Sequence, residues 1–300
     1  MKGVKNEMDL LQLKYFQKVA QLKHLTQAAN ELYITQPALS QTIARLEKDI
    51  GVPLFNRTGR QINLNEYGRV FLEKVEIALH ALEEGKREIA DMAGLERGTV
   101  SIDTTFLPHF SDVINSFRTF YPDVQFTISQ TTTIEKKEQL LESGGIDFSI
   151  SCKPINKNGI SNIPIQTEEM LIAVPFKHPL ANRKSVKLSE ISNEDFIHFK
   201  KGHSFRDATD EICQKARFTM NVVCEADDAN TIKELLKSNL GIAFWLESLL
   251  EKDIPFHYLH IEESENQRIY YLSWSEKRYL SLAAQNFQEL LIQHYNNGDS

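Results

Sequence analysis

The chain has 300 residues, the length of about two ordinary domains. Hydrophobic residues make up 41% and charged residues 25% of it, which excludes a disordered or fibrous protein. The formal net charge of −7 argues, as an average, against a partner as acidic as nucleic acid. However, residues 1–64 carry nine basic and five acidic side chains, a net charge of +4, which leaves −11 for the rest of the chain. The average therefore conceals a basic N-terminal part.

Cysteine usage and hydropathy point to a protein of the reducing cytoplasm. The three cysteines, Cys152, Cys213 and Cys224, are far apart and form no Cys-x-x-Cys pair, so we expect neither a disulfide framework nor a zinc knuckle. The N-terminus lacks the apolar core of a signal peptide, and the longest apolar run, around Leu240 to Leu246, is far shorter than the ~20 residues that span a bilayer. We expect a cytoplasmic localisation and no membrane partner.

Two kinds of hydrophobic periodicity divide the sequence. Up to about Gly94 the pattern is almost entirely helical, and beyond it short apolar strands alternate with helices, which predicts an α/β architecture with largely parallel sheets. The expected strands are 99–105, 124–130, 146–151, 170–174, 196–199, 221–226, 241–246, 256–261 and 268–274. The expected helices between them include 111–120, 134–142, 205–216, 228–237 and 276–295.

Residues 26–51 carry the strongest local signal, that of two capped helices joined by a short turn. Thr26 is placed to cap the first helix, and Thr35 to cap the second, with Pro37 in the first turn. The second helix has a buried stripe at spacings of four, three and four, and Gly51 ends it; the stripe consists of Leu39, Ile43, Leu46 and Ile50. This pattern predicts a helix-turn-helix with one polar face left outward.

The outward face of the second helix suits the major groove of DNA. It carries Gln36, Pro37, Ser40, Gln41, Ala44 and Lys48, with Arg45 at its edge. Glutamine bonds bidentately to adenine, serine bonds to either kind of base edge, and arginine or lysine reaches guanine or phosphate. The basic surplus of residues 1–64 supports this interpretation over a plain helical bundle with a solvated polar face.

Two further elements complete the N-terminal prediction. Residues 52–64 read as two short extended pieces around a turn that holds Gly59, a hairpin wing with Arg57 and Arg60 near DNA. From Asn65 to about Gly94 a long helix carries an apolar seam at spacings of four and three, which predicts a two-stranded coiled coil and a dimer. The seam consists of Phe71, Val75, Ala78, Leu82, Gly85, Ile89 and Met92, of which only Gly85 weakens it. The alternative is a helix packed on its own domain.

These residues carry a family resemblance. The segments that carry it in residues 8–68 include Ala28-Ala29, Thr35-Gln36-Pro37-Ala38-Leu39-Ser40, Leu46-Glu47, Gly51-Val52-Pro53-Leu54-Phe55 and Leu64-Asn65. They closely resemble the winged helix-turn-helix of LysR-type transcriptional regulators. Weaker similarity continues through Tyr121-Pro122-Asp123, Gly145-Ile146-Asp147, His178-Pro179-Leu180 and Leu240-Gly241-Ile242, so the resemblance covers nearly the whole chain.

The resemblance implies an α+β multidomain fold and a set of partners. Residues 1–65 would form the winged helix-turn-helix, 66–94 the linker and dimerisation helix, and 95–300 a regulatory domain resembling periplasmic solute-binding proteins, with subdomain I at 95–167 and 272–300 and subdomain II at 168–271. It implies double-stranded operator DNA, a homodimer or homotetramer, and a small-molecule effector as partners. DNA contacts would map to Thr26, Gln36, Pro37, Ser40, Gln41, Arg45 and Arg57. Many members carry arginine where this chain has Gln41, which favours adenine over guanine there.

Polar clusters at strand ends mark a candidate effector pocket, since open α/β sheets bind ligands beyond the carboxyl ends of their strands. The expected pocket residues are Thr104, Thr105, Thr131, Thr132, His203, Ser204 and Phe205. Hydroxyls and helix N-terminal amides there suit a carboxylate or phosphate, so the effector is expected to be an anion. The same threonines and serines also fit ordinary helix caps.

Other functional classes find little support. The sequence lacks a dinucleotide-binding glycine motif, a phosphate loop and a nucleophile elbow, so we expect no enzyme and no cofactor. His257 and His260 would point to opposite faces of one strand, so we expect no metal site. Two alternatives stay open: a cytoplasmic solute-binding protein without DNA activity, and redox sensing through a cysteine.

Overall fold

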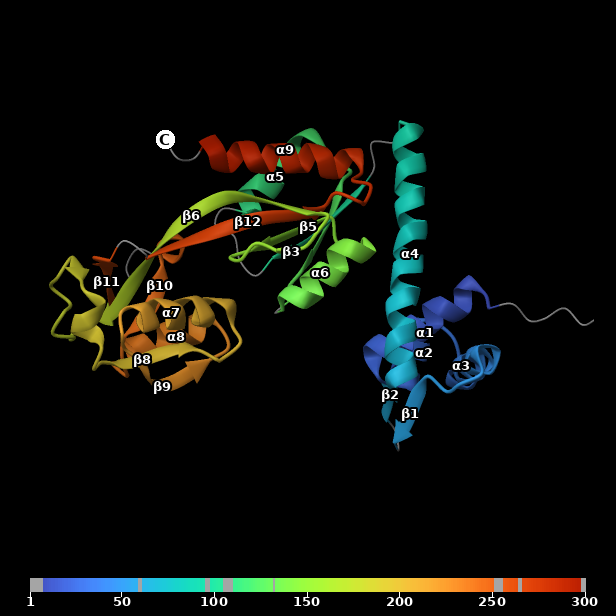
Figure 1. Ribbon diagram of the computed structural model, residues 1–300, viewed down its shortest axis with the longest axis horizontal. Helices are drawn as coiled ribbons and strands as arrows, with labels where there is room; N and C mark the ends of the chain where they lie inside the picture. Colours follow the sequence, from blue (N-terminus) through green and yellow to red (C-terminus); the bar gives the residue numbers. More distant parts are fainter. Residues whose placement is uncertain are drawn as a thin grey trace, which may run out of the picture. The chain divides into compact units, whose positions relative to one another are not determined.

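A computed structural model describes residues 8–58, 61–94, 98–104, 110–131, 133–250, 256–263 and 266–297 (Figure 1). The chain divides into two compact units, Met1–Leu95 with Glu142–Gly145, and Glu96–Leu141 with Ile146–Ser300. Each unit has its own hydrophobic core, so each is described by itself below.

The described residues of the N-terminal unit form four helices and a hairpin. They are α1 (Leu10–Leu22), α2 (Leu25–Glu31), α3 (Gln36–Ile50), β1 (Phe55–Thr58), β2 (Gln61–Leu64) and α4 (Glu66–Met92). A capping box between Asp9 and Gln12 begins α1, and the Asn65 side chain accepts the Gly68 amide at the start of α4. Gly51 ends α3 at φ +91°, a left-handed conformation that glycine adopts without strain.

The helix caps differ from the predicted ones in two places. Thr26 lies inside α2, and the residue before that helix, His24, is its cap, because the His24 ring accepts the Gln27 amide at 3.3 Å. Thr35 occupies the N-cap position of α3, but its side chain makes no capping hydrogen bond. The predictions for Thr26 and for the Thr35 hydroxyl as helix caps were therefore wrong, whereas Gly51 ends α3 as predicted.

The N-terminal core is built around Phe16 of α1, which has no exposed surface. Its ring centroid lies 5.3 Å from that of Phe55 in β1 and 5.2 Å from that of Phe71 in α4. Val75 and Leu79 of α4 are buried in the same cluster. The first half of α4 is thus an integral part of the N-terminal core.

One sheet of eight strands, in the order β4-β3-β5-β12-β6-β11-β7 with β10 also paired to β6, forms the frame of the second unit. Its first half uses β3 (Thr99–Thr104), β4 (Gln125–Ser129), β5 (Phe148–Ser151), β6 (Ile160–Pro175) and β12 (Gln267–Ser275). Helices α5 (Phe110–Phe120) and α9 (Leu282–Asn297) lie on one face, and α6 (Ile134–Ser143) on the other (Figure 1). Phe287 of α9 is buried in the core between α5, α9 and the sheet.

The second half of the sheet extends from the far end of β6. It contains β7 (Ser185–Val186), β10 (Ala243–Leu246) and β11 (Phe256–Ile261). A separate two-stranded sheet consists of β8 (Asp195–Phe199) and β9 (Asn221–Ala226). The same half contains the helices α7 (Ser204–Lys215) and α8 (Ala229–Lys237) and two short 3-10 helices, η1 (Leu188–Ile191) and η2 (Glu247–Leu249). Asp228 caps α8 by accepting the Thr231 amide at 2.9 Å.

Two long strands, β6 and β12, connect the two halves of the second unit (Figure 1). They pair antiparallel over the full length of β12, from Ile160 with Ser275 to Glu169 with Gln267. The remainder of β6 pairs antiparallel with β10 and β11. Among the described residues, parallel pairing joins β3 with β4 and β5, β8 with β9, and β11 with β7, with one isolated parallel bridge between Phe196 and Ile242. The long strands β6 and β12 pair antiparallel, so the prediction of largely parallel sheets was wrong.

Candidate DNA interface and effector cleft

The buried stripe of α3 fixes which of its side chains face outward. Leu39, Ile43 and Leu46 have no exposed surface, as predicted. The expected DNA contacts on the other side of α3 are all partly or wholly exposed: Gln36, Pro37, Ser40, Gln41 and Arg45. An α-helix with a polar outer face of this width fits the major groove of B-form DNA.

The helix before α3 packs tightly enough to hold it in a helix-turn-helix geometry. Ala28 and Ala29 of α2 are 0% and 1% exposed, and small side chains at such positions let two helices approach closely. Thr26 is exposed in the first turn of α2, where helix amides bind a phosphate group. The turn between the helices carries Tyr33, 96% exposed with a φ of +55°, a residue that the sequence pattern did not single out.

Glu47 of α3 ties the reading helix to the hairpin. Its Oε1 accepts the backbone amides of Leu54 at 2.8 Å and Phe55 at 3.2 Å, just where the hairpin begins. Strands β1 and β2 pair antiparallel from Phe55 with Leu64 to Thr58 with Gln61, which agrees with the predicted wing. The wing residues Gly59 and Arg60 and the side chain of Arg57 lie outside the described part of the chain.

The predicted seam along α4 separates into two parts. Val75 is 2% exposed and Phe71 packs against the same core, so these two side chains lie inside their own unit and are unavailable to a coiled coil. The seam prediction was wrong for these two residues because the first half of α4 packs against the core of the helix-turn-helix. Further along, Leu82, Ile89 and Met92 are 51%, 68% and 83% exposed, and Ala78 is also exposed. We call these four side chains the α4 stripe.

The second unit contains a cavity of about 390 Å³ at the carboxyl ends of β4, β8 and β9. The described residues that line it are Gln130, Phe199, His203, Phe205, Asp227, Asp228, Ala229, Asn230, Phe244, Trp245, Leu246, Leu249 and Arg268. Gln130 follows a strand of the first half of the sheet, and most of the others belong to the second half. The cavity therefore lies in the cleft between the two halves of the second unit, which β6 and β12 connect.

The cavity wall contains only part of the expected pocket set. His203 and Phe205 line the cavity. Thr104, which is 9% exposed, and Thr131, whose hydroxyl donates to Asp103, are not among the described residues of the wall. Thr105, Thr132 and the side chain of Ser204 lie outside the described part of the chain.

Thr131 belongs to a buried polar cluster beside the cleft. The carboxylate of Asp103, with no exposed surface, accepts the hydroxyls of Thr131 at 2.5 Å and Ser129 at 3.1 Å and pairs with the ammonium group of Lys137, 2% exposed. Thr131 directly follows the cavity residue Gln130, so this cluster fixes the loop that carries Gln130. The four side chains come from β3, the end of β4 and α6, and no sequence spacing brings them together.

Arg268 of β12 contributes the one cationic side chain among the described residues of the cavity wall. It is 5% exposed, and its Nε donates to Cys152 Sγ at 2.6 Å. Its guanidinium carbon lies 5.3 Å from the Phe205 ring centroid and 5.1 Å from that of Tyr270, which are cation–π distances. No sequence pattern predicts the role of Arg268, because its contacts come from segments far apart in the chain.

His203 has two structural roles at the cavity. Its ring accepts the Phe205 amide at the start of α7, and it stacks on the Phe199 ring at a centroid distance of 4.1 Å and an angle of 7°. Burial, and next the nearby Arg268 cation, lower the pKa of His203, which keeps the ring neutral at neutral pH.

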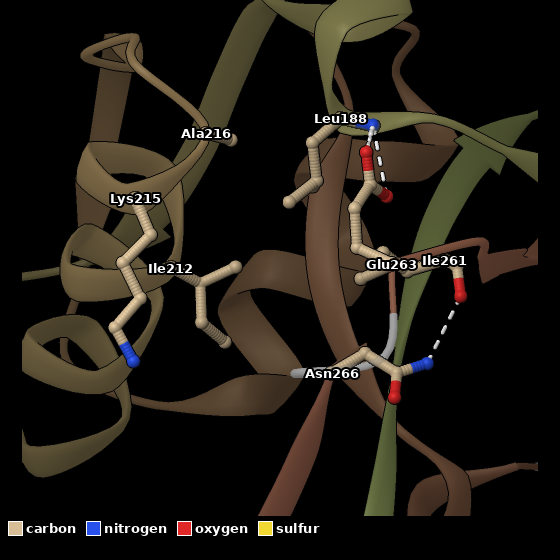
Figure 2. A pocket seen from close by; sticks show the side chains of 7 residues that line it. All are labelled: Leu188, Ile212, Lys215, Ala216, Ile261, Glu263 and Asn266. Atoms are coloured by element: carbon tan, nitrogen blue, oxygen red, sulfur yellow. Dashed lines mark hydrogen bonds between the residues drawn. The ribbon is translucent and has the colours of Figure 1, made fainter.

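A second hollow of about 320 Å³ lies between α7 and β11, with Leu188 and Ile212 on opposite sides of it (Figure 2). Its polar groups are bonded within the chain: Glu263 accepts the Leu188 amide at 2.9 Å, and Asn266 donates to the Ile261 carbonyl at 3.0 Å. Lys215 pairs with Glu211 at 3.6 Å. The hollow thus combines an apolar wall with polar groups that are hydrogen-bonded or ion-paired within the chain.

The cysteines and histidines show no reactive arrangement in the described part of the chain. Burial raises the pKa of Cys152, and it raises that of Cys213 to about 12, so both thiols stay protonated at neutral pH. No group of three His, Cys, Asp or Glu side chains suited to a metal is found among the described residues. No helix in the ranges that the structure describes is long and apolar enough to cross a membrane.

The fold and these sites define a protein class: a winged helix-turn-helix joined by a long helix to a two-part α/β ligand-binding domain. Residues 10–69 match the family model for the bacterial regulatory helix-turn-helix protein of the lysR family, and residues 93–296 match the LysR substrate binding domain. The chain belongs to the LysR family of transcriptional regulators, as the sequence motifs predict.

Known relatives cover almost the whole chain. It is 38% identical to the HTH-type transcriptional regulator YybE of Bacillus subtilis (strain 168), over 96% of this chain and 99% of that one. It is 32% identical to the transcriptional dual regulator GltC of the same organism, over 96% and 98%. The crystal structure of full-length CbnR complexed with its target DNA has the same fold, with a TM-score of 0.72, 20% identity, and coverage of 97% of this chain and 99% of that one.

Proposed function

We propose that this LysR-type regulator reads operator DNA with the outward face of α3. The observation that carries the proposal is the division of α3 into a buried side and an exposed polar side with the base-reading chemistry of Gln36, Ser40 and Gln41. Thr26 would hold a phosphate at the start of α2, and Arg45 and Arg57 would contact the backbone from α3 and the wing. The exposed Tyr33 joins this set as a further phosphate contact.

The regulator acts as a homodimer, either alone or as one of two dimers in a tetramer. The α4 stripe supports this step, because it leaves large apolar side chains in water on a helix whose flanking residues are charged. A two-fold dimer presents two copies of α3 to two half-sites of a symmetric operator.

The effector binds in the cleft cavity of the second unit. This cavity lies at the carboxyl ends of three strands and has the buried Arg268 cation in its wall, whereas the second hollow has its polar groups bonded internally. Closure of the two halves about β6 and β12 would change the spacing of the DNA-reading units. The relatives are transcriptional regulators, which supports a protein of the cytoplasm without enzymatic activity or cofactor.

A gel shift on the DNA directly upstream of the protein's own gene tests this proposal. We expect a retarded species at low salt that weakens steeply as salt is raised, because phosphate contacts release counterions. The absence of any retarded species at low salt, with dimeric protein, would leave the alternative of a solute-binding protein without DNA activity.

A further inference from the structure

The two strands that connect the halves of the second unit each bury one charged side chain. Glu168 of β6 is 4% exposed, and Arg268 of β12 is 5% exposed. The two residues are direct partners in the antiparallel register of β6 and β12, so their side chains start from neighbouring positions on one face of the sheet. Opposite charges on cross-strand neighbours offset each other, which makes it possible for both to be buried.

Glu168 contacts both halves of the unit. Its Oε2 accepts the hydroxyl of Tyr270 at 2.8 Å, and the Tyr270 ring is fully buried in the hydrophobic core of the first half. Its Oε1 accepts the backbone amide of Ser248 at 2.8 Å, and Ser248 lies in η2 of the second half. One buried carboxylate therefore joins the core of the first half to a 3-10 helix of the second.

Arg268 bridges the same two halves. Its Nε donates to Sγ of Cys152 at 2.6 Å, and Cys152 directly follows β5 and packs against the core of the first half. Its guanidinium carbon lies 5.3 Å from the ring centroid of Phe205, which is buried in the core of the second half. Two neighbouring buried charges thus each hold one group from each half.

These contacts depend on the angle between the two halves. Burial raises the pKa of the Tyr270 hydroxyl, so at neutral pH this group stays a hydrogen-bond donor to Glu168. Rotation of one half against the other would draw the Ser248 amide away from Glu168, or Phe205 away from Arg268. A buried charge that loses its partners is costly, so the contacts stabilise the angle at which all of them are made.

We propose that Glu168 and Arg268 form a latch that sets the angle between the two halves of the second unit. The latch consists of these two side chains with Tyr270, Cys152, Phe205 and the Ser248 amide. This inference rests on the proposed closure of the halves about β6 and β12. Because Arg268 also lines the cavity, a ligand that draws its guanidinium away from Cys152 or Phe205 would release the latch.

A distance measurement between the two halves tests the proposal. Spin labels are attached at Glu289 of α9 and Glu234 of α8, both exposed, through a keto-bearing amino acid that leaves the three cysteines untouched. Labelled full-length protein is diluted with an excess of unlabelled protein, so that double electron–electron resonance reports the distance within one chain.

Variants that break the latch should change this distance. Glu168→Gln loses the charge and one of the two acceptor positions, and Arg268→Met loses the charge and the donor but keeps an unbranched side chain. We expect a narrow distance distribution in the wild type, and a broader distribution with a displaced maximum in both variants. The wild-type distribution in folded Glu168→Gln and Arg268→Met overturns the proposal.

Arg206→Met is the matched control, because this arginine is also buried, 6% exposed. In the described part of the chain its contacts stay within the second half, with the carboxylates of Asp210 and Glu225 and the carbonyl of Phe199. Its loss should leave the distance between the halves unchanged. An equal change in Arg206→Met and Arg268→Met would show a general loosening of the unit and overturns the proposal.

Tyr270→Phe keeps the test decisive if the charge variants fail to fold. This substitution removes one hydrogen bond to Glu168 and leaves both charges and the buried ring in place. We expect a broader distance distribution than in the wild type, and an unchanged one overturns the proposal.

Gel shifts with the same preparations separate the latch from the proposed function. If wild-type protein binds DNA and the variants keep the wild-type distance, the latch is wrong and the regulator function stands. If wild-type protein does not bind DNA, the proposed function fails, and the distance distributions still decide the latch.

Discussion

Glu47 shows how a single side chain couples the two DNA-facing elements. It lies on α3, behind the reading face, and accepts two amides at the beginning of the wing. Its neighbours Leu46 and Leu54 are buried, so the carboxylate is held at the edge of the core. The position of the wing relative to the reading helix therefore depends on this contact.

Replacement of Glu47 by alanine should loosen the wing. Two amides lose their acceptor, at a cost of about 1–3 kcal/mol in local stability. Hydrogen–deuterium exchange should become faster at residues 53–56, while Glu47→Gln, which keeps an acceptor oxygen, should remain close to the wild type. Equal exchange in the alanine and glutamine variants would show that this acceptor does not hold the wing.

His198 is a buried neutral histidine beside the cleft. Its Nδ1 accepts the Phe199 amide at 2.7 Å, and its Nε2 donates to the Thr209 hydroxyl at 2.6 Å, which itself donates to backbone carbonyls. Burial, and next the Arg206 and His203 charges, lower the pKa of His198 from 6.5 to about 3.

This pKa predicts an acid-sensitive second unit. Between pH 6.5 and 3 the unfolded chain binds a proton at His198 that the folded chain excludes, so stability falls as pH falls through this range. Because of His198, the free energy of unfolding should fall by about 1.4 kcal/mol for each pH unit of acidification, and His198→Gln should remove this dependence. Urea unfolding at several pH values in this range measures how the free energy of unfolding depends on pH. The same dependence in the wild type and in His198→Gln would refute the lowered pKa of His198.

At the residue scale, the sequence predicted side chains whose role depends on local spacing. Gln36 and Ser40 follow from the period of one helix, and the structure leaves both at least partly exposed beside a buried stripe. Arg268 follows from no local pattern, because its contact with Cys152 joins residues 116 positions apart. The Asp103 and Lys137 pair was missed for the same reason, with 34 positions between its members.

At the scale of elements, the boundaries of most short strands and helices agree with the periodicity, and the long strand β6 does not. Residues 170–174 were predicted as a strand, but β6 begins at Ile160. Pro164, which has no amide to donate, breaks the strand pattern there, and the pairing register with β12 shifts beside it. Similarly, the predicted helix at 276–295 begins at Leu282, because residues 276–281 form a turn and an irregular segment after β12.

Two glycines of α4 provide an opposed pair of variants. A Cβ at Gly68 would lie 2.1 Å from the backbone oxygen of Leu54, whereas a Cβ at Gly85 meets nothing within 4 Å. Gly68→Ala should therefore destabilise the N-terminal unit by about 1–3 kcal/mol, and Gly85→Ala should stabilise the helix by about 1 kcal/mol. Hydrogen exchange of the α4 amides measures the change in stability in each variant. A change of the same sign in Gly68→Ala and Gly85→Ala would contradict the packing described.

The exposed end of α4 supplies the test of dimerisation. Leu82→Glu places a charge in the α4 stripe and should yield monomers in analytical ultracentrifugation, because an apolar interface cannot bury an unpaired carboxylate. Glu88→Gln, on the same helix and also exposed, is the control and should remain dimeric. If Leu82→Glu remains dimeric, the dimer interface does not lie at the α4 stripe.

At the scale of the whole molecule, the net positive charge lies in residues 1–64, and the helix α4 that follows is already acidic. The part with a net charge of +4 contains α3 and the wing, and the acidic remainder contains most of the ligand-binding unit. This arrangement attracts DNA to the reading helix and repels it from the acidic unit. The net charge of −7 thus averages over two parts with opposite expected relations to DNA.

We expect the outward face of α3 to read a symmetric DNA sequence. Selection from a random-sequence DNA pool by the full-length protein should enrich one dyad-symmetric site, and Gln36→Ala with Ser40→Ala should lose that preference, at about 1–3 kcal/mol per contact, while weak nonspecific binding persists. Enrichment of the same site by the double variant, or of no symmetric site by the wild type, would contradict the account.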